Sequence, residues 1–445
     1  MTQASISSVV NLFKKNYSKM NANDVLTDGL KITEDIPFSE KARVGESYVE
    51  AVILGSEVGI TYAGSGSNLF SINPASAGAV QQAVITPYIS MLRSIIPYQT
   101  ISRSSGSDSA FVEATKHVMK NNIASHKRFL EIAKIYGQAT NNLGYVSYAT
   151  ATYRTVSFTN GAGTLISSLF GSVAFTAGVN TTDKYILLAP GNFASGIWVG
   201  MQGVKVKQIA TSSGLVVAEG TLVAVDSALG ILKVDFTPVA ASSTTSHKLA
   251  FDGMESANEM VGIKKILNNT GSLFSISAAT YPLWKANTVA LSSVKLTLAN
   301  LASAVADTVN AGGLMGKVKA YCNPRSFNKV VSDQAALRQY VTDQNKEFKN
   351  GAMSIEFAFP DVTLELVGSR YIMEGDCLIL RIEDWECGGS SDVQISIPGM
   401  PDERLIFSLE SQGGYAFNTY ADEFIFCRLP AKQTYISGIN DESAS

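Results

Sequence analysis

The chain is poor in charged side chains. Only 16% of its 445 residues are Asp, Glu, Lys or Arg, whereas about 25% is usual for soluble domains. Because surface charge keeps protein molecules apart, we expect much of the surface to be covered by other protein. The formal net charge of −3 also gives no overall basic field that would attract nucleic acid.

Long apolar runs, a secretory leader and paired cysteines are missing as well. No stretch of about 18 uninterrupted apolar residues is present to cross a membrane, and the N-terminus lacks the basic-then-apolar order of a signal peptide. The cysteines show no Cys-x-x-Cys spacing, so we expect buried free thiols in a reducing compartment. They are Cys322, Cys377, Cys387 and Cys427. These absences favour a protein that is made and kept in a cytoplasm, without a membrane partner.

Histidine, a common general base and metal ligand, occurs only three times. His117 and His126 lie nine residues apart on a predicted helix, so their side chains point in opposite directions and cannot share a metal ion. His247 lies in a predicted linker. We therefore expect ordinary surface histidines.

Other motifs for chemistry are incomplete. The segment Gly312–Val318 is similar to a phosphate-binding loop, but it lacks the first glycine and the Ser or Thr that should follow Lys317. The acids on either side of Trp385 fit a solvated loop better than an acid–base pair. The sequence predicts a protein that is not an enzyme and has no catalytic residue, metal or cofactor.

The stretch Val44–Leu92 contains no Lys, Arg or Asp. Its charged residues are Glu46, Glu50 and Glu57. Two β-prone runs, Tyr48–Leu54 and Val84–Leu92, flank a middle rich in Gly, Ser, Ala and Asn, which predicts a long two-stranded arm. Such a ribbon is marginally stable alone, and its edges lack the charges that normally prevent pairing with other chains. The arm therefore folds onto its own body or lies across another molecule, and we favour the second.

A long amphipathic helix is predicted over 110–136. Apolar side chains recur on one face with a period of 3.6 residues, and Gly137 suits the left-handed position that ends many helices. At 1.5 Å per residue the helix would be about 40 Å long, enough to back a whole sheet. The residues expected to pack on that sheet are Phe111, Val118, Phe129, Ile132 and Tyr136.

Short β-prone runs separated by turn signals fill 150–248, and they predict a small, self-contained all-β sandwich or barrel. One of these runs is Gly196–Val199. Beyond it, an apolar stripe from Val294 to Val309 predicts a helix, and Pro324 begins another. The strands predicted in this last part are Lys317–Cys322, Ser354–Phe359, Val362–Val367, Cys377–Ile382, Arg404–Leu409 and Glu423–Arg428.

The order of these elements resembles that of the major capsid proteins of tailed bacteriophages. Local strings that carry the resemblance are Leu130–Gln138, Asn142–Val146, Phe251–Gly253, Val261–Leu267, Leu283–Asn287, Cys322–Phe327 and Phe424–Pro430. The resemblance implies an α+β fold of the Hong Kong 97 type. Its parts would be an N-terminal arm (1–43), an extended loop or β-ribbon (44–100), a peripheral domain with a long spine helix (101–149), an inserted all-β domain (150–248), an axial domain (249–345) and a strand-rich return shared by the peripheral and axial domains (346–445).

The implied function is structural. Copies would form the hexamers and pentamers of an icosahedral shell around a double-stranded DNA genome, assembled in the host bacterial cytoplasm and kept in the virion. The expected partners are a portal, a decoration protein and packaged DNA that touches the inner face without sequence specificity. Because only about 40 residues precede the arm, we expect a separate scaffolding protein, unless the inserted domain takes that role. Because the arm has no lysine for an isopeptide bond, we expect a non-covalent shell.

We expect the extended loop to make the contacts between subunits. Charge complementarity would set its register and apolar side chains would supply burial. The charged residues are Arg43, Glu46, Glu50 and Glu57, and the apolar ones are Tyr48, Val52 and Leu54. The alternatives are the shell of a bacterial encapsulin-type compartment and, from another class, a β-rich secreted hydrolase or adhesin. The missing leader and the incomplete motifs weigh against the last.

Overall fold

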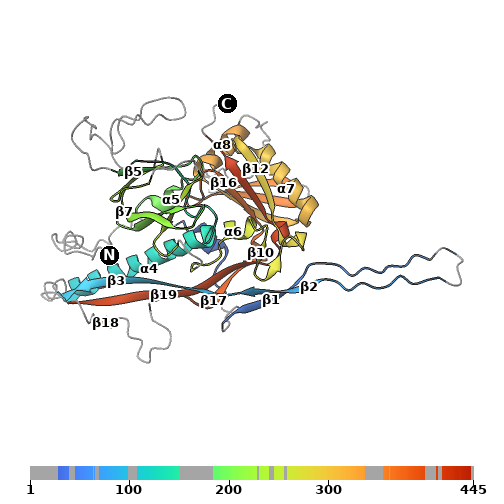
Figure 1. Ribbon diagram of the computed structural model, residues 1–445, viewed down its shortest axis with the longest axis horizontal. Coiled ribbons are helices and arrows are strands. Elements are labelled where there is room, and N and C mark those ends of the chain that lie inside the picture. Colours follow the sequence, from blue (N-terminus) through green and yellow to red (C-terminus); the bar gives the residue numbers. More distant parts are fainter. Residues whose placement is uncertain are drawn as a thin grey trace, which may run out of the picture.

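The longest element is the helix α4 (Asp108–Tyr136), which lies along a sheet whose strands come from distant parts of the chain (Figure 1). The computed structural model describes residues 29–39, 46–63, 65, 70–98, 108–150, 184–227, 230–239, 245–254, 258–335, 354–359, 361–395, 407–408 and 413–441. The helix predicted over 110–136 is confirmed and begins two residues earlier. The sheet beneath it comprises β3 (Tyr88–Pro97), β17 (Trp385–Gln394), β18 (Phe407–Ser408) and β19 (Gly414–Cys427). The predicted strand Arg404–Leu409 lies mostly outside the described residues.

The end of α4 differs from the prediction. The left-handed residue is Gln138, with a φ of 53°, and not Gly137. Glycine is nevertheless required at 137, because a Cβ atom there would lie 2.2 Å from the carbonyl oxygen of Met260. The close approach of another segment, and not the helix cap, therefore accounts for this glycine.

A second, mixed sheet of six strands carries two helices and its own apolar core. Its strand β16 is buried at all five positions, as expected for a strand covered on both faces. The strand order is β12 (Asn287–Val294), β20 (Thr434–Ile439), β16 (Asp376–Leu380), β13 (Gly316–Cys322), β15 (Val362–Gly368) and β14 (Ser354–Phe359), with α7 (Leu298–Gly312) and α8 (Pro324–Ala335) packed on it. Val294, which we expected to be helical, ends β12, because α7 begins only after Thr297, whose side chain accepts a hydrogen bond from the Asn300 N–H.

The third sheet is antiparallel and has six strands, in the order β4 (Val146–Thr150), β5 (Lys184–Leu188), β8 (Ile231–Val234), β7 (Val216–Asp226), β6 (Lys205–Ala210) and β9 (His247–Phe251). Its first and last strands meet through a bridge between Tyr145 and Lys248, so the sheet closes into a barrel. The barrel extends past the predicted limits of 150–248 at both ends. The run Gly196–Val199 is not a strand but part of the short helix α5 (Ser195–Trp198), because apolar runs of four residues do not distinguish the two structures.

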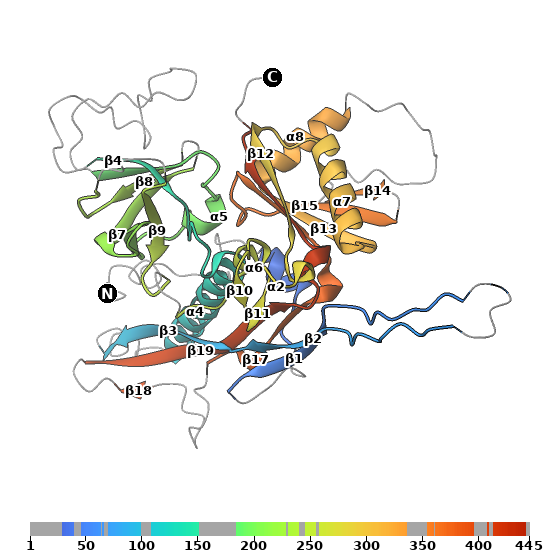
Figure 2. The ribbon, with the colours of Figure 1, turned by 45° about the vertical axis from the view of Figure 1, so that its right-hand side comes forward.

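The barrel is not self-contained, contrary to our expectation. Trp198 and Phe251 from the barrel share one buried cluster with Ile132 and Tyr136 of α4. The ring of Phe251 lies 5.5 Å from the rings of both Trp198 and Phe129. The barrel therefore shares its core with the long helix, beside which it lies in Figure 2.

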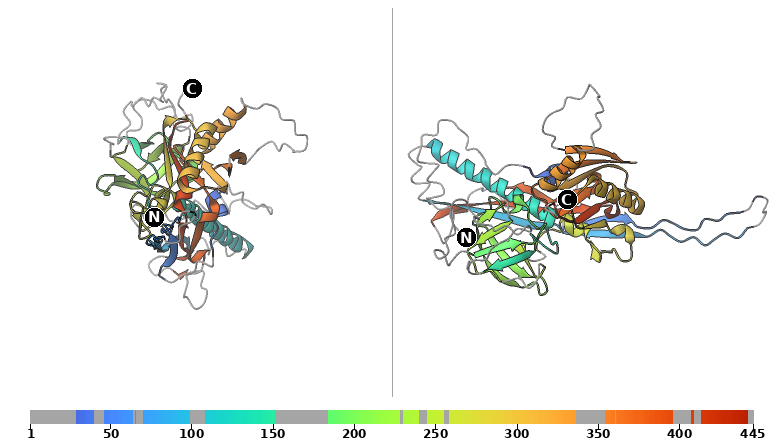
Figure 3. Two further views of the ribbon diagram at one scale, coloured as in Figure 1. Left: turned by 90° about the vertical axis from the view of Figure 1, so that its right-hand side faces the viewer. Right: turned by 90° about the horizontal axis from the view of Figure 1, so that it is seen from above.

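The arm is a two-stranded ribbon that projects far from the body (Figure 3). β1 (Tyr48–Ile53) pairs antiparallel with β2 (Val80–Ile85). The predicted second run, Val84–Leu92, is therefore divided: its first two residues belong to the arm, and from Tyr88 onward it pairs with β19 in the body. Pro87 lies at the division, and its missing N–H is unsuited to a continuous ladder.

Short elements fill the space between the arm, α4 and the mixed sheet. The segment 258–284, which we expected in the axial domain, packs on α4 and on the base of the arm. The short elements are α2 (Lys31–Asp35), α6 (Ile263–Leu267), β10 (Ser272–Leu273), β11 (Ile276–Ser277) and the 3₁₀ turns η2 (Pro282–Trp284), η3 (Ile382–Asp384) and η4 (Pro430–Lys432).

All four cysteines are free and buried, as predicted. Among the described helices, none has the length and apolar character of a membrane span.

Candidate functional site

The root of the arm, which we define as β1, Leu54 and β2, turns one face toward the body. Side chains alternate along β1, so that Tyr48, Glu50 and Val52 face inward while Val49 and Ile53 face outward. This is the side-chain period of a β-strand. Val52 is 6% exposed and Leu54 8% exposed.

The body supplies an aromatic seat for this inner face. Val52 and Leu54 belong to one buried cluster with Trp284, Phe424 and Phe426. The ring of Tyr48 stacks on that of Phe424, with 5.4 Å between centroids. The indole N–H of Trp284 donates to a carbonyl oxygen at 3.1 Å, which leaves the aromatic surface of the seat to the arm.

These contacts correct part of our prediction. We expected Val52 and Leu54 to bury themselves against a neighbouring subunit, but both are already covered by their own chain. Tyr48 is half-buried on Phe424 of the same chain. The sequence shows an apolar strand but not which surface covers it, because that surface comes from segments far along the chain, 274–284 and β19.

A charged cluster holds the same face. The guanidinium of Arg428 contacts Glu50 at 3.2 Å and Glu386 at 2.6 Å. The Tyr48 hydroxyl donates to the Glu50 carboxylate. Burial, followed by this hydrogen bond, raises the pKa of Tyr48 to about 12. Glu50 therefore sets a contact within the subunit, whereas we expected one between subunits.

The outer face of the root is apolar and open. In the ribbon register Val49 lies opposite Val84, and Ile53 lies opposite Val80. These four side chains are between 37% and 74% exposed. An exposed apolar face of this kind favours contact with another chain.

Beyond the root, hydrogen bonds join the two sides of the ribbon at two places among its described residues. Val58 and Ser76 exchange backbone hydrogen bonds of 3.0 and 2.6 Å, and Asn73 bonds to Thr61 and Ile60 at 2.9 Å. Large apolar side chains here stand in solvent: Val58, Ile60, Tyr62, Phe70 and Ile72, with Tyr62 86% exposed. Glu46 at the base and Glu57 along the ribbon are exposed too, and Arg43 lies outside the described residues.

The predicted packing residues of the spine helix differ in their surroundings. Ile132 and Tyr136 are buried in the main core, Phe129 packs against it, and Val118 is half-buried. The side chain of Phe111 lies outside the described part of the chain. The helix also buries charged groups that periodicity did not reveal: Lys134 pairs with Glu423 at 3.0 Å, with both side chains at most 3% exposed.

His126 is not a surface histidine, contrary to our expectation. It is 3% exposed, and its ring nitrogens bond to the hydroxyls of Ser90 at 2.8 Å and Thr419 at 2.9 Å. Burial lowers its pKa to about 4. The neutral ring thus joins α4 to β3 and β19, where the arm meets the body.

Of the three acids around Trp385, Glu383 is solvated as expected, with its side chain 74% exposed, but the other two are not. Asp384 is buried, accepts a hydrogen bond from Gln433 at 3.2 Å, and has a pKa raised by burial. Glu386 belongs to the cluster at the root of the arm. Across the described ranges, no three His, Cys, Asp or Glu side chains lie close enough to hold a metal ion.

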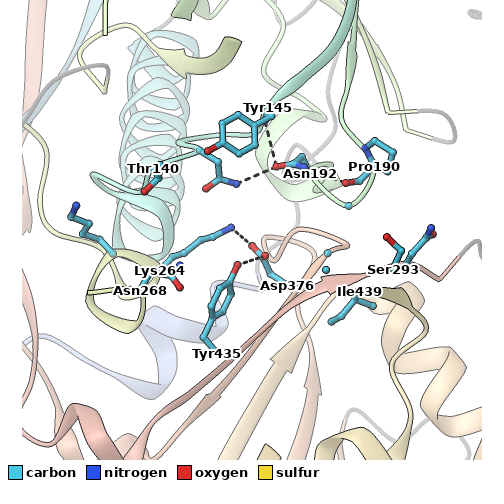
Figure 4. Close-up of a pocket in the computed structure, with 16 residues that line it drawn as sticks. Thr140, Tyr145, Pro190, Asn192, Lys264, Asn268, Ser293, Asp376, Tyr435 and Ile439 are labelled. Atoms are coloured by element: carbon cyan, nitrogen blue, oxygen red, sulfur yellow. Dashed lines mark hydrogen bonds and ion pairs between the residues drawn. The ribbon is translucent and has the colours of Figure 1, made fainter. Parts of the chain in front are cut away.

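A polar groove of about 330 Å³ lies where α6, the barrel and the mixed sheet meet. Figure 4 shows Lys264 and Tyr435 both pointing at Asp376, at 2.6 Å each. Across the groove, the Asn192 carbonyl accepts from the Asn141 side chain at 3.1 Å. Because Lys264 and Asp376 neutralise each other, we take this cluster as a joint between three parts of the fold.

Comparison with solved structures identifies the fold. The chain is similar to a chain of the cyanophage A-1(L) capsid asymmetric unit, with a TM-score of 0.52 and 8% identity over 98% of this chain and 99% of that one. A capsid chain of a native GTA particle has a TM-score of 0.47 and 8% identity, over 98% of this chain and 99% of that one. A chain of the capsid of Myoviridae phage XM1 has a TM-score of 0.41 and 9% identity, over 97% of this chain and 98% of that one. No protein-family model and no curated protein sequence matches. The first similarity shows that this chain has the Hong Kong 97-type capsid fold.

Proposed function

We propose that the protein is the major capsid subunit of a tailed phage, and that its activity is self-assembly into a closed shell. The observation that carries the proposal is the arm: its root is fixed to the body, while its outer face and its far part expose apolar side chains. Covering these side chains on a second copy would remove apolar surface from water. Each such contact can be modest, because a closed symmetric assembly repeats it in every subunit.

The fold supports this proposal, since one chain of known structure that is similar over 98% of this chain belongs to a cyanophage capsid. In the proposed shell, subunits form hexamers and pentamers around double-stranded DNA. A portal and a separate scaffolding protein take part in assembly, and a decoration protein is a further partner. Arg43, Glu46 and Glu57 remain our candidates for charged contacts with the neighbour, and the barrel, taken as 146–251, is the inserted domain.

The test is negative-stain electron microscopy of the purified chain, with limited proteolysis of the unassembled protein. We expect closed particles, and cleavage within 55–79 that is rapid in the free subunit and slow in the particle. A compact monomer at high concentration whose arm resists protease would contradict the proposal. Boiling in detergent should return single chains, since the arm offers no lysine for a cross-link.

A further inference from the structure

The arm is long, so a small rotation at its root displaces its far end by a large distance. From Gly55 to Ser65 the chain runs ten residues away from the body, which at about 3.3 Å per residue is about 33 Å. A rotation of about 10° at the root would move the far end by about 6 Å, more than the roughly 4.8 Å between neighbouring strands. The far end can therefore meet a defined set of contacts only if the root angle is held more tightly than this.

The aromatic seat does not fix that angle alone, because apolar burial is non-directional. Directional contacts come from the Val84 N–H to the Phe274 carbonyl and from Gln81 to Tyr281, both at 3.1 Å. The contact through Arg428 differs from these neutral hydrogen bonds, because its positive charge lies between Glu50 of the arm and Glu386 of the body. Its contact with Glu386 is a charge-assisted hydrogen bond, of a kind roughly twice as strong as a neutral one, and its contact with Glu50 is an ion pair.

Arg428 is itself held in place. Its backbone N–H donates to the Asp384 carbonyl at 2.8 Å, and the preceding residue, Cys427, pairs with Trp385 at the end of the sheet. The planar guanidinium reaches Glu386 of β17 with one nitrogen and Glu50 of β1 with another. Arginine suits this position, because its rigid fork holds two acceptors in a fixed geometry.

We propose that Arg428 is a positioning residue that aims the arm: by holding Glu50 of the arm against Glu386 of the body, it sets the angle at which the ribbon leaves the subunit. The inference rests on the proposed function, because the angle matters only if the arm reaches a neighbour. Arg428 is 47% exposed along its side chain, so salt should weaken the contact.

The experiment measures the arm angle in the unassembled subunit. Spin labels are attached through Tyr62→Cys on the arm and Ser303→Cys on α7, both exposed positions, while the four native cysteines are buried. Electron paramagnetic resonance then gives the distribution of distances between the labels. Tyr62 lies seven residues beyond Gly55, about 23 Å along the arm, so a rotation of about 10° moves its label by about 4 Å. Arg428→Gln should therefore widen this distribution by about 4 Å, and should raise the concentration needed for assembly roughly threefold to fivefold.

Further variants distinguish an effect on the arm angle from an unspecific effect of removing a surface ion pair. Glu386→Gln, which leaves the arginine in place, should widen the distribution in the same direction. Arg428→Lys keeps the charge but not the fork and should give an intermediate width. The matched control is Arg325→Gln, which removes an ion pair to Glu374 at similar exposure, away from the arm, and should change neither width nor assembly.

An unchanged distribution in both Arg428→Gln and Glu386→Gln would overturn the inference. So would a wide distribution with normal assembly, since aiming would then have no consequence. If the unsubstituted chain forms no closed particles while Arg428→Gln still widens the distribution, the proposed function fails but the positioning of the arm by Arg428 stands.

Discussion

The root and the far part of the arm have similar apolar composition but opposite surroundings. Val52 and Ile85 at the root are at most 6% exposed, whereas Tyr62 and Ile72 farther out are at least 76% exposed. The root contributes to the stability of the subunit itself. The far part can gain from burial only by contact with another molecule. The comparison shows that an apolar, weakly charged ribbon does not by itself reveal whether it serves folding or association.

The largest difference between the two parts should appear in stability. Phe426→Ala removes a fully buried ring that contacts Tyr48, Phe274 and Trp284. We expect the free energy of unfolding to fall by about 3–5 kcal/mol, measured by urea denaturation. Phe70→Ala, at a ring 56% exposed in the far part, should change it by less than about 0.5 kcal/mol. If Phe426→Ala and Phe70→Ala lowered the free energy of unfolding equally, the root and the far part of the arm would not differ in their contribution to subunit stability.

The contact of His126 with β3 and β19 should also respond to acid. As the pH falls, His126 is protonated at about 6.5 in the unfolded chain but only at about 4 in the folded one, so the unfolded state binds more protons. Its contribution is complete above pH 6.5 and is lost progressively below, by about 2 kcal/mol at pH 5 and about 3 kcal/mol at pH 4.

The measurement is the unfolding free energy of the natural chain minus that of His126→Gln, from pH 7 to pH 4. The difference is needed because burial raises the pKa values of Glu131 and Glu423, and their protonation in the folded state stabilises it in acid. A flat difference would show that His126 does not titrate between these limits.

The smallest effect on stability, with a large effect on assembly, is expected in the far part. Ile72→Asp places a charge on a side chain that is 76% exposed in the free subunit, so the free energy of unfolding should change by less than about 0.5 kcal/mol. Closed particles should disappear in electron micrographs, since the charge would have to be buried against a neighbour. Ile72→Val is the matched control and should assemble normally.

Local patterns were sufficient for several elements. The periods of α4 and β13 and the proline that begins α8 were read correctly. Proline at the start of a helix has no N–H to leave unpaired, so its signal needs no tertiary context. The same reasoning missed β12 and β20, and it failed for α5, where four apolar residues fit either structure.

The candidate site was predicted only in outline. The sequence indicated an arm and its poverty in charge, but the partners of Glu50 and Tyr48 could not be read from their neighbours. Arg428 and Phe424 lie near the other end of the chain, and no local pattern connects them to β1. His126 was misjudged for the same reason, because Ser90 and Thr419 come from two other strands.

The sequence alone determined where the long helix, the first strand of the arm and several of the barrel strands lie, because hydrophobic periods and turn residues act over a few neighbouring positions. Only the tertiary structure decided which half of the arm belongs to the subunit and which half is left for a neighbour. That choice depends on aromatic and charged side chains brought from η2 and from the C-terminal strands. The burial of a strand face is fixed by the surface that folds over it, and that surface is made elsewhere in the chain.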